Sequence, residues 1–108
     1  MHFIMNEFLT NNEINQFKQD GAIFIKEKFD LSWIEKLKKG IERDIKKPSP
    51  RFKSHTLEKG VPAYLEDYWT WDLVPEFKDF VYNSPYAKIA SELMSAKKIN
   101  LVMDNWFL

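Results

Sequence analysis

Residues 98–108 constrain the fold most, because their side chains alternate at every second position in a strongly apolar segment. Ile99, Leu101, Met103, Asn105 and Phe107 form one set, and Asn100, Val102, Asp104, Trp106 and Leu108 form the other. A period of two is typical of a β-strand, and apolar groups on both faces indicate a strand inside a sheet. We expect this strand to find its partners in further chain or in a second copy, since an unpaired strand leaves its backbone groups unsatisfied. We therefore interpret the chain as the front part of a longer protein.

Two helices are predicted in the first half of the chain. Thr10 and Glu13 form a capping-box pattern, and the helix that they begin ends at Gly21. The short apolar run 22–25 then predicts a buried strand. A second capping box begins the next helix, at Ser32 and Glu35. Its apolar face recurs at helical spacing, at Trp33, Ile34, Leu37, Ile41 and Ile45. Pro48 and Pro50 prevent its continuation.

Two more helices are predicted before the terminal strand. Asp72 is placed to cap a helix with Pro75 in its first turn, and Ser84-Pro85 begins another that reaches Met94. Residues from about 48 to 72 sustain no period, which predicts a long loop. The order of elements favours an α+β fold, and the length favours one domain over residues 1–108.

The long loop carries a dense group of aromatic residues, including Tyr68, Trp69 and Trp71. Side chains of this size either close the core or line a pocket, and both roles remain open. Asp67 and Asp72 are candidates for a carboxylate pair, although Asp72 is better placed as a helix cap.

Composition excludes several classes of protein. Sixteen basic and sixteen acidic residues cancel, so the chain lacks the overall positive field of a protein that binds nucleic acid or an anionic membrane. The basic run 46–53 is a candidate for meeting a phosphate group, or it is a solvated loop. The absence of cysteine, of a signal-peptide pattern at residues 1–7 and of a long apolar run indicates a cytoplasmic protein.

A metal site is disfavoured by the small number of suitable ligands. The chain has no cysteine and only two histidines, His2 and His55, and neither begins a His-x-Asp or His-x-Glu step. Gly-rich phosphate loops and nucleophile elbows are also missing from the sequence.

Several segments, in this order, resemble the amino-terminal region of the phytanoyl-CoA dioxygenase family. They are Leu9-Thr10 with Glu13-Ile14, Phe17, the run 20–25, the amphipathic second helix, Ser84-Pro85 with Ile89-Ala90 and Leu93-Met94, and Asp104-Asn105-Trp106-Phe107. The resemblance covers nearly the whole chain. It implies a helical region and the first strands of a double-stranded β-helix, in an oxygenase that uses Fe(II) and 2-oxoglutarate on a small-molecule substrate.

The family's iron ligands, a His-x-Asp step and a later His, have no counterpart in these residues. The resemblance therefore implies a fragment that binds neither iron nor 2-oxoglutarate and is inactive alone. We expect Trp69, Trp71, Asp104 and Trp106 to form part of a pocket wall. We also expect a homo-oligomer through the terminal strand from Ile99 to Leu108. The alternative is a self-sufficient module that binds a partner or ligand, or assembles with itself, through its aromatic residues.

Overall fold

The computed structural model describes residues 6–55, 59–60 and 64–108, which form a mixed structure of helices and a small antiparallel sheet. The elements in chain order are α1 (Asn11–Asp20), α2 (Leu31–Lys46), β1 (Lys53–His55), β2 (Tyr64–Tyr68), α3 (Pro75–Asn83), α4 (Tyr86–Met94) and β3 (Asn105–Phe107). The expected α+β class is confirmed. Within these residues no helix has the length and apolar character needed to cross a membrane.

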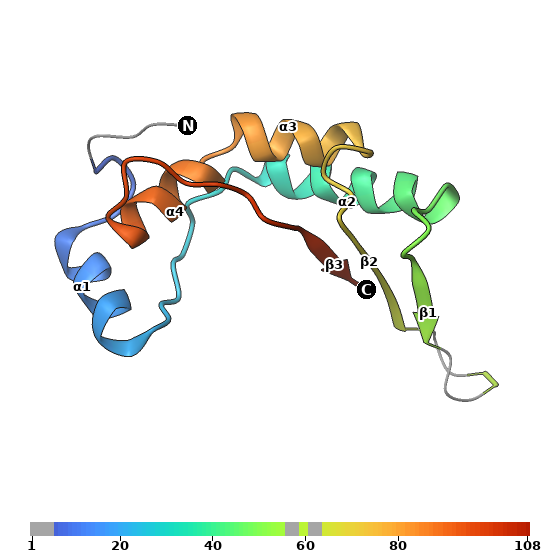
Figure 1. Ribbon diagram of the computed structural model, residues 1–108, viewed down its shortest axis with the longest axis horizontal. Coiled ribbons are helices and arrows are strands. Elements are labelled where there is room, and N and C mark those ends of the chain that lie inside the picture. Colours follow the sequence, from blue (N-terminus) through green and yellow to red (C-terminus); the bar gives the residue numbers. More distant parts are fainter. Residues whose placement is uncertain (1–5, 56–58, 61–63) are drawn as a thin grey trace.

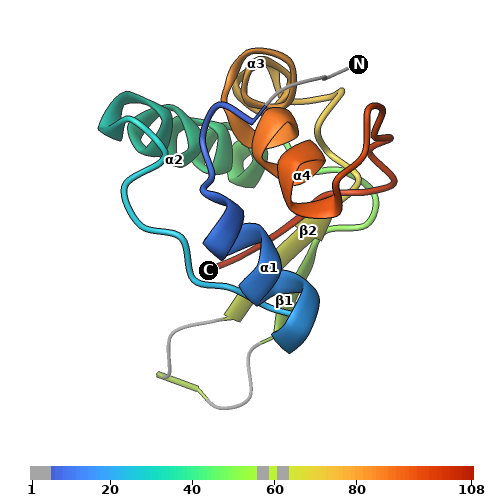
Figure 2. The same cartoon turned by 90° about the vertical axis from the view of Figure 1, so that its left-hand side faces the viewer.

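The molecule is elongated and has two ends (Figure 1). We call α1, α4 and the buried cluster of Leu9, Ile14 and Ile89 the helical end. The sheet end comprises α2, α3, the three strands and the buried cluster of Val74, Phe77 and Trp106. Figure 2, viewed toward the helical end, shows α1 and α4 in front of the sheet. The radius of gyration is 16.3 Å, whereas a compact chain of about 100 residues has a value of about 13 Å.

The first helix follows the local sequence signals closely. The Thr10 side chain accepts a hydrogen bond from the Glu13 amide, and the Glu13 side chain accepts one from the Thr10 amide. Gly21 ends the helix in the left-handed conformation, with φ of 78°, which glycine adopts without steric cost. The predicted helix between Thr10 and Gly21 is therefore confirmed.

The predicted strand at residues 22–25 is wrong. This segment has no strand assignment and joins α1 to α2. Ile25 packs on the cluster of the helical end, whereas Phe24 is 80% exposed. An apolar run becomes a strand only when a neighbouring strand accepts its backbone hydrogen bonds, so the pattern alone was insufficient.

The second and third helices form where expected, but their caps differ. Asp30, rather than Ser32, is the N-cap of α2, and its carboxylate accepts a hydrogen bond from the Ser32 amide. The N-cap of α3 is Val74, which makes no side-chain hydrogen bond, so the cap predicted at Asp72 is also wrong. Pro75 occupies the first turn as predicted, and α4 begins directly after Pro85.

The predicted loop at residues 48–72 contains two of the three strands. β1 pairs with β2 in antiparallel fashion, with Lys53 opposite Glu66, and β2 pairs with β3, with Asp67 opposite Trp106. The terminal strand is also shorter than expected, since only residues 105–107 of the predicted span 99–108 are assigned to it. β3 pairs along one edge with β2, the central strand of the sheet. Among the described residues, no strand pairs with its other edge, which is an outer edge of the sheet.

Candidate functional site

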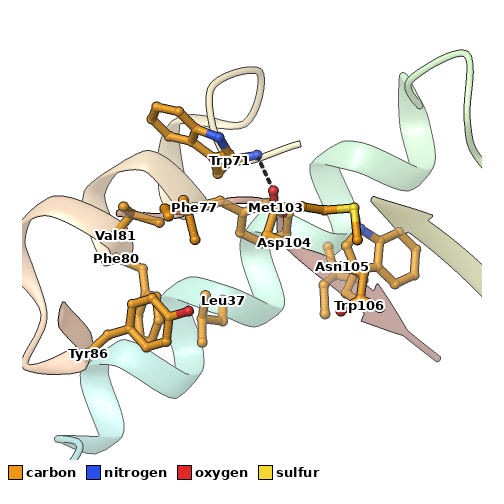
Figure 3. A pocket seen from close by; sticks show the side chains of 12 residues that line it. Leu37, Trp71, Phe77, Phe80, Val81, Tyr86, Met103, Asp104, Asn105 and Trp106 are labelled. Atoms are coloured by element: carbon orange, nitrogen blue, oxygen red, sulfur yellow. Dashed lines mark hydrogen bonds between the residues drawn. The ribbon is translucent and has the colours of Figure 1, made fainter. Parts of the chain in front are cut away.

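The principal candidate site is an apolar cavity of about 330 Å³ between α2, α3, the start of α4 and the segment that leads into β3 (Figure 3). Its lining comprises Leu37, Ile41, Trp71, Phe77, Phe80, Val81, Tyr86, Leu101, Met103, Asp104, Asn105 and Trp106. Cavities that bind small molecules are typically apolar with a few fixed polar groups. This lining suits a neutral, apolar ligand.

Three of the four residues expected in a pocket wall meet at this cavity. Trp71, Asp104 and Trp106 line it, whereas Trp69 does not. Trp69 is 53% exposed and contributes to a separate hollow beside Arg51, whose guanidinium carbon lies 6.0 Å from the centre of the Trp69 ring. Trp69 also has a positive φ of 58°, so the backbone turns between the two tryptophans and separates their side chains.

Asp104 holds the turn that places Trp71 at the cavity. Its Oδ1 accepts hydrogen bonds from the backbone amides of Thr70 and Trp71, at 3.0 and 3.1 Å, and its Oδ2 accepts one from the Thr70 hydroxyl at 2.9 Å. Figure 3 shows the bond to Trp71 as a dashed line. Both carboxylate oxygens are thus occupied by the turn, so we assign Asp104 a positioning role.

Trp106 connects the cavity to two buried carboxyl groups. Its indole Nε1 donates a hydrogen bond of 3.0 Å to Oδ2 of Asp44, on α2. Asp44 in turn lies against Asp67 of β2. Asp67 accepts hydrogen bonds from the backbone amide and hydroxyl of Ser49 and from the backbone amide of Tyr68. This network joins α2, the residues that follow it, β2 and β3.

The two carboxyl groups have opposite pKa shifts. Burial, together with the neighbouring Asp67, raises the pKa of Asp44 to about 7. The pKa of Asp67 is lowered despite its burial, because hydrogen bonds from Asp44, Ser49 and Tyr68 stabilise its ionised form. Below about pH 7 the pair therefore carries one proton, and that proton resides on Asp44.

The sequence did not indicate Asp44 or Ser49, and the candidate partner that it offered for Asp67 was Asp72. Asp72 is exposed and lies outside this network, whereas Asp44 is 2% exposed. A signal for Asp44 was present, because it follows Leu37 and Ile41 by seven and three residues and so shares their apolar helical face. A carboxyl group on such a face needs a buried partner, but the partner's identity depends on the tertiary structure.

The residues described here do not fit a metal centre. Among them, no three His, Cys, Asp or Glu side chains are grouped so that they could hold a metal ion. His55 lies at the sheet surface, where its Nε2 is 3.4 Å from a carboxylate oxygen of Glu66. His2 lies outside the described residues.

Comparison with known proteins finds no matching family model, no matching curated protein and no matching solved structure.

Proposed function

We propose that this chain is the amino-terminal part of a cytoplasmic hydroxylase similar to the phytanoyl-CoA dioxygenase family, with a double-stranded β-helix as its catalytic domain. In this proposal the chain supplies the wall of a substrate cavity, and Fe(II) and 2-oxoglutarate are held by residues elsewhere in the protein. The family resemblance is the basis of the proposal. No catalytic step is assigned to the residues of this chain.

The structural observation that supports the proposal is a set of exposed apolar side chains outside the helices. Phe24 is 80% exposed in the segment between α1 and α2, and Val102 is 84% exposed in the segment before β3. Leu73, Phe107 and Leu108 are also more than half exposed. Large apolar patches mark interaction sites, and these exposed side chains supply apolar surface on several segments of the chain. It supports a region that packs against a further part of the same protein.

The alternative is a self-sufficient binding module, and the cavity is the observation that favours it. A space of about 330 Å³ with a mainly apolar lining is large enough for a small neutral ligand. In this alternative, the outer edge of β3 and the exposed Phe107 provide a surface for pairing with a second copy of the chain. The molecular mass in solution, measured over a range of concentrations, tests this association.

The experiment that tests the main proposal begins with the coding DNA beyond Leu108 at its original source. We expect an in-frame continuation that encodes His-x-Asp and a later His. The extended protein should then release CO₂ from 2-oxoglutarate in an Fe(II)-dependent manner, and an Ala substitution of either histidine should abolish the reaction. The 108-residue chain is the matched control, and we expect it to be inactive. A stop codon directly after Leu108, or turnover by the 108-residue chain alone, would overturn the proposal.

A further inference from the structure

Two buried carboxyl groups meet where α2 packs on the sheet. Asp44 is 2% exposed and Asp67 is 0% exposed, and they come from α2 and β2, respectively. Asp67 lies opposite Trp106 in the sheet, and the Trp106 indole donates to Asp44, so the two carboxyl groups lie within hydrogen-bonding reach of one another. Two carboxylates in contact in a buried site cannot both carry a full charge without a large energetic cost. A hydrogen bond between them requires a shared proton.

The hydrogen-bond donors decide which group holds the proton. Asp67 Oδ1 accepts from the Ser49 hydroxyl at 2.5 Å and from the Tyr68 amide at 2.8 Å, and its Oδ2 accepts from the Ser49 amide at 3.1 Å. Ser49 lies between Pro48 and Pro50, which restrict its backbone and help to hold both of its donors in place. Asp44 accepts from Trp106 Nε1 at 3.0 Å. The richer set of donors stabilises the charge on Asp67, and Asp44 is the protonated partner.

The charged groups on the surrounding elements do not stabilise an ionised Asp44. The segment before β3 contributes Asp104, a further negative charge that disfavours ionisation of Asp44. On α3, Glu76 is bound by Arg43 of α2, with Nε 2.7 Å from a carboxylate oxygen. In the loop after α2, Arg51 donates to the backbone carbonyls of Tyr68 and Trp69.

We propose that Asp44 and Asp67 form a pH-dependent contact, which holds α2 against the sheet while Asp44 is protonated and weakens when Asp44 ionises. Ionisation removes the shared proton and places two buried carboxylates against one another. Because Trp106 donates to Asp44 and also lines the cavity, the change reaches the cavity wall. The raised pKa of Asp44, about 7, places the transition near neutral pH.

The test is an NMR titration of the full 108-residue chain from about pH 5 to about pH 8.5. The carboxyl carbon of Asp44 reports its ionisation, and the indole N–H of Trp106 reports the change at the hydrogen bond to Asp44. We expect both signals to shift with a common midpoint at about pH 7. The absence of an Asp44 transition anywhere in this range, as expected for a group with the ordinary pKa of 3.8, would overturn the proposal.

Asp44→Asn is the variant that removes the titration while keeping the hydrogen bonds. Its amide donates to Asp67 and its carbonyl accepts from Trp106 at every pH, so the Trp106 signal should no longer shift near pH 7. Asp20→Asn, at the exposed end of α1, is the matched control and should keep the transition. A transition of the Trp106 signal that persists in Asp44→Asn would contradict the proposed contact. Should that variant fail to fold, the titration of the unmodified chain decides the question.

Discussion

The two ends of the molecule each bury an acidic side chain, but they satisfy it in different ways. At the helical end, Glu92 is 4% exposed and accepts hydrogen bonds from the backbone amides of Glu7, Phe8 and Leu9. At the sheet end, Asp44 accepts one bond from an indole and shares a proton with Asp67. Backbone amides donate at any pH, whereas a carboxyl group donates only while it is protonated. The comparison teaches that the same chemical group is held by backbone amide donors at one end, and at the other end by a partner that can donate only while a proton is bound.

The largest expected effect is at the helical end. Glu92→Ala removes the acceptor for three backbone amides and should lower the free energy of unfolding by about 4 kcal/mol. Urea denaturation measures the loss. Hydrogen exchange of the Leu9 backbone amide should accelerate more than exchange of the backbone amides at the sheet end. Glu92→Gln is the control, since it keeps one acceptor oxygen and should lose less. Unchanged protection of the Leu9 amide in Glu92→Ala would show that this anchor is unimportant.

The second prediction concerns pH and the sheet end. The folded pKa of Asp44, about 7, lies above its ordinary value of 3.8, so the folded chain holds a proton that the unfolded chain has released. The free energy of unfolding should therefore fall as pH rises through this window and level off above it. We expect a loss of up to about 3 kcal/mol between about pH 5 and about pH 8. Urea denaturation at both pH values measures it, and Asp44→Asn should remove most of the difference.

The third prediction tests the contact of α2 with α3. A Cβ atom added at Gly40 would lie 2.5 Å from Cε1 of Phe77, so the helices approach closely only because this position has no side chain. Gly40→Ala should cost about 2 kcal/mol, because overpacking outweighs the gain of about 1 kcal/mol in helix propensity. A double-mutant cycle with Phe77→Leu measures the coupling between the two positions. Simple additivity of the two substitutions would argue against this contact.

The smallest expected effect is at the start of α1. Thr10→Ala removes the side-chain half of the capping box and should lower the free energy of unfolding by about 1 kcal/mol. Thr10→Ser keeps the hydroxyl and should be close to the original chain in the same urea denaturation experiment. A loss larger than that of Glu92→Ala would reverse the order of importance proposed for the helical end.

Sequence patterns predicted the helices more successfully than the strands. The α1 boundaries follow from Thr10, Glu13 and Gly21, whose effects act within one turn of the chain. β1 and β2 were hidden because they are short and largely polar, and each is defined by hydrogen bonds to a distant segment. The apolar run 22–25 looked more like a strand, yet it has no strand assignment. Strand formation depends on a partner, which local composition does not reveal.

The candidate site, too, was predicted only in part from the sequence. Aromatic density drew attention to Trp69 and Trp71, and the alternation near the end of the chain drew attention to Asp104 and Trp106. The positive φ of Trp69 then directs it away from the cavity that the other three residues line. The cavity arises where α2, α3 and the segment before β3 come together, so its outline was not predictable from any one of them.

The sequence by itself determined the positions of the helices, because capping side chains, prolines and a left-handed glycine act on backbone groups only a few residues away. The tertiary structure alone decided the sheet and the pairing of Asp44 with Asp67. These depend on groups from separate elements meeting in a buried place, where hydrogen bonds and the cost of burying charge select which side chains are joined and which one keeps the proton.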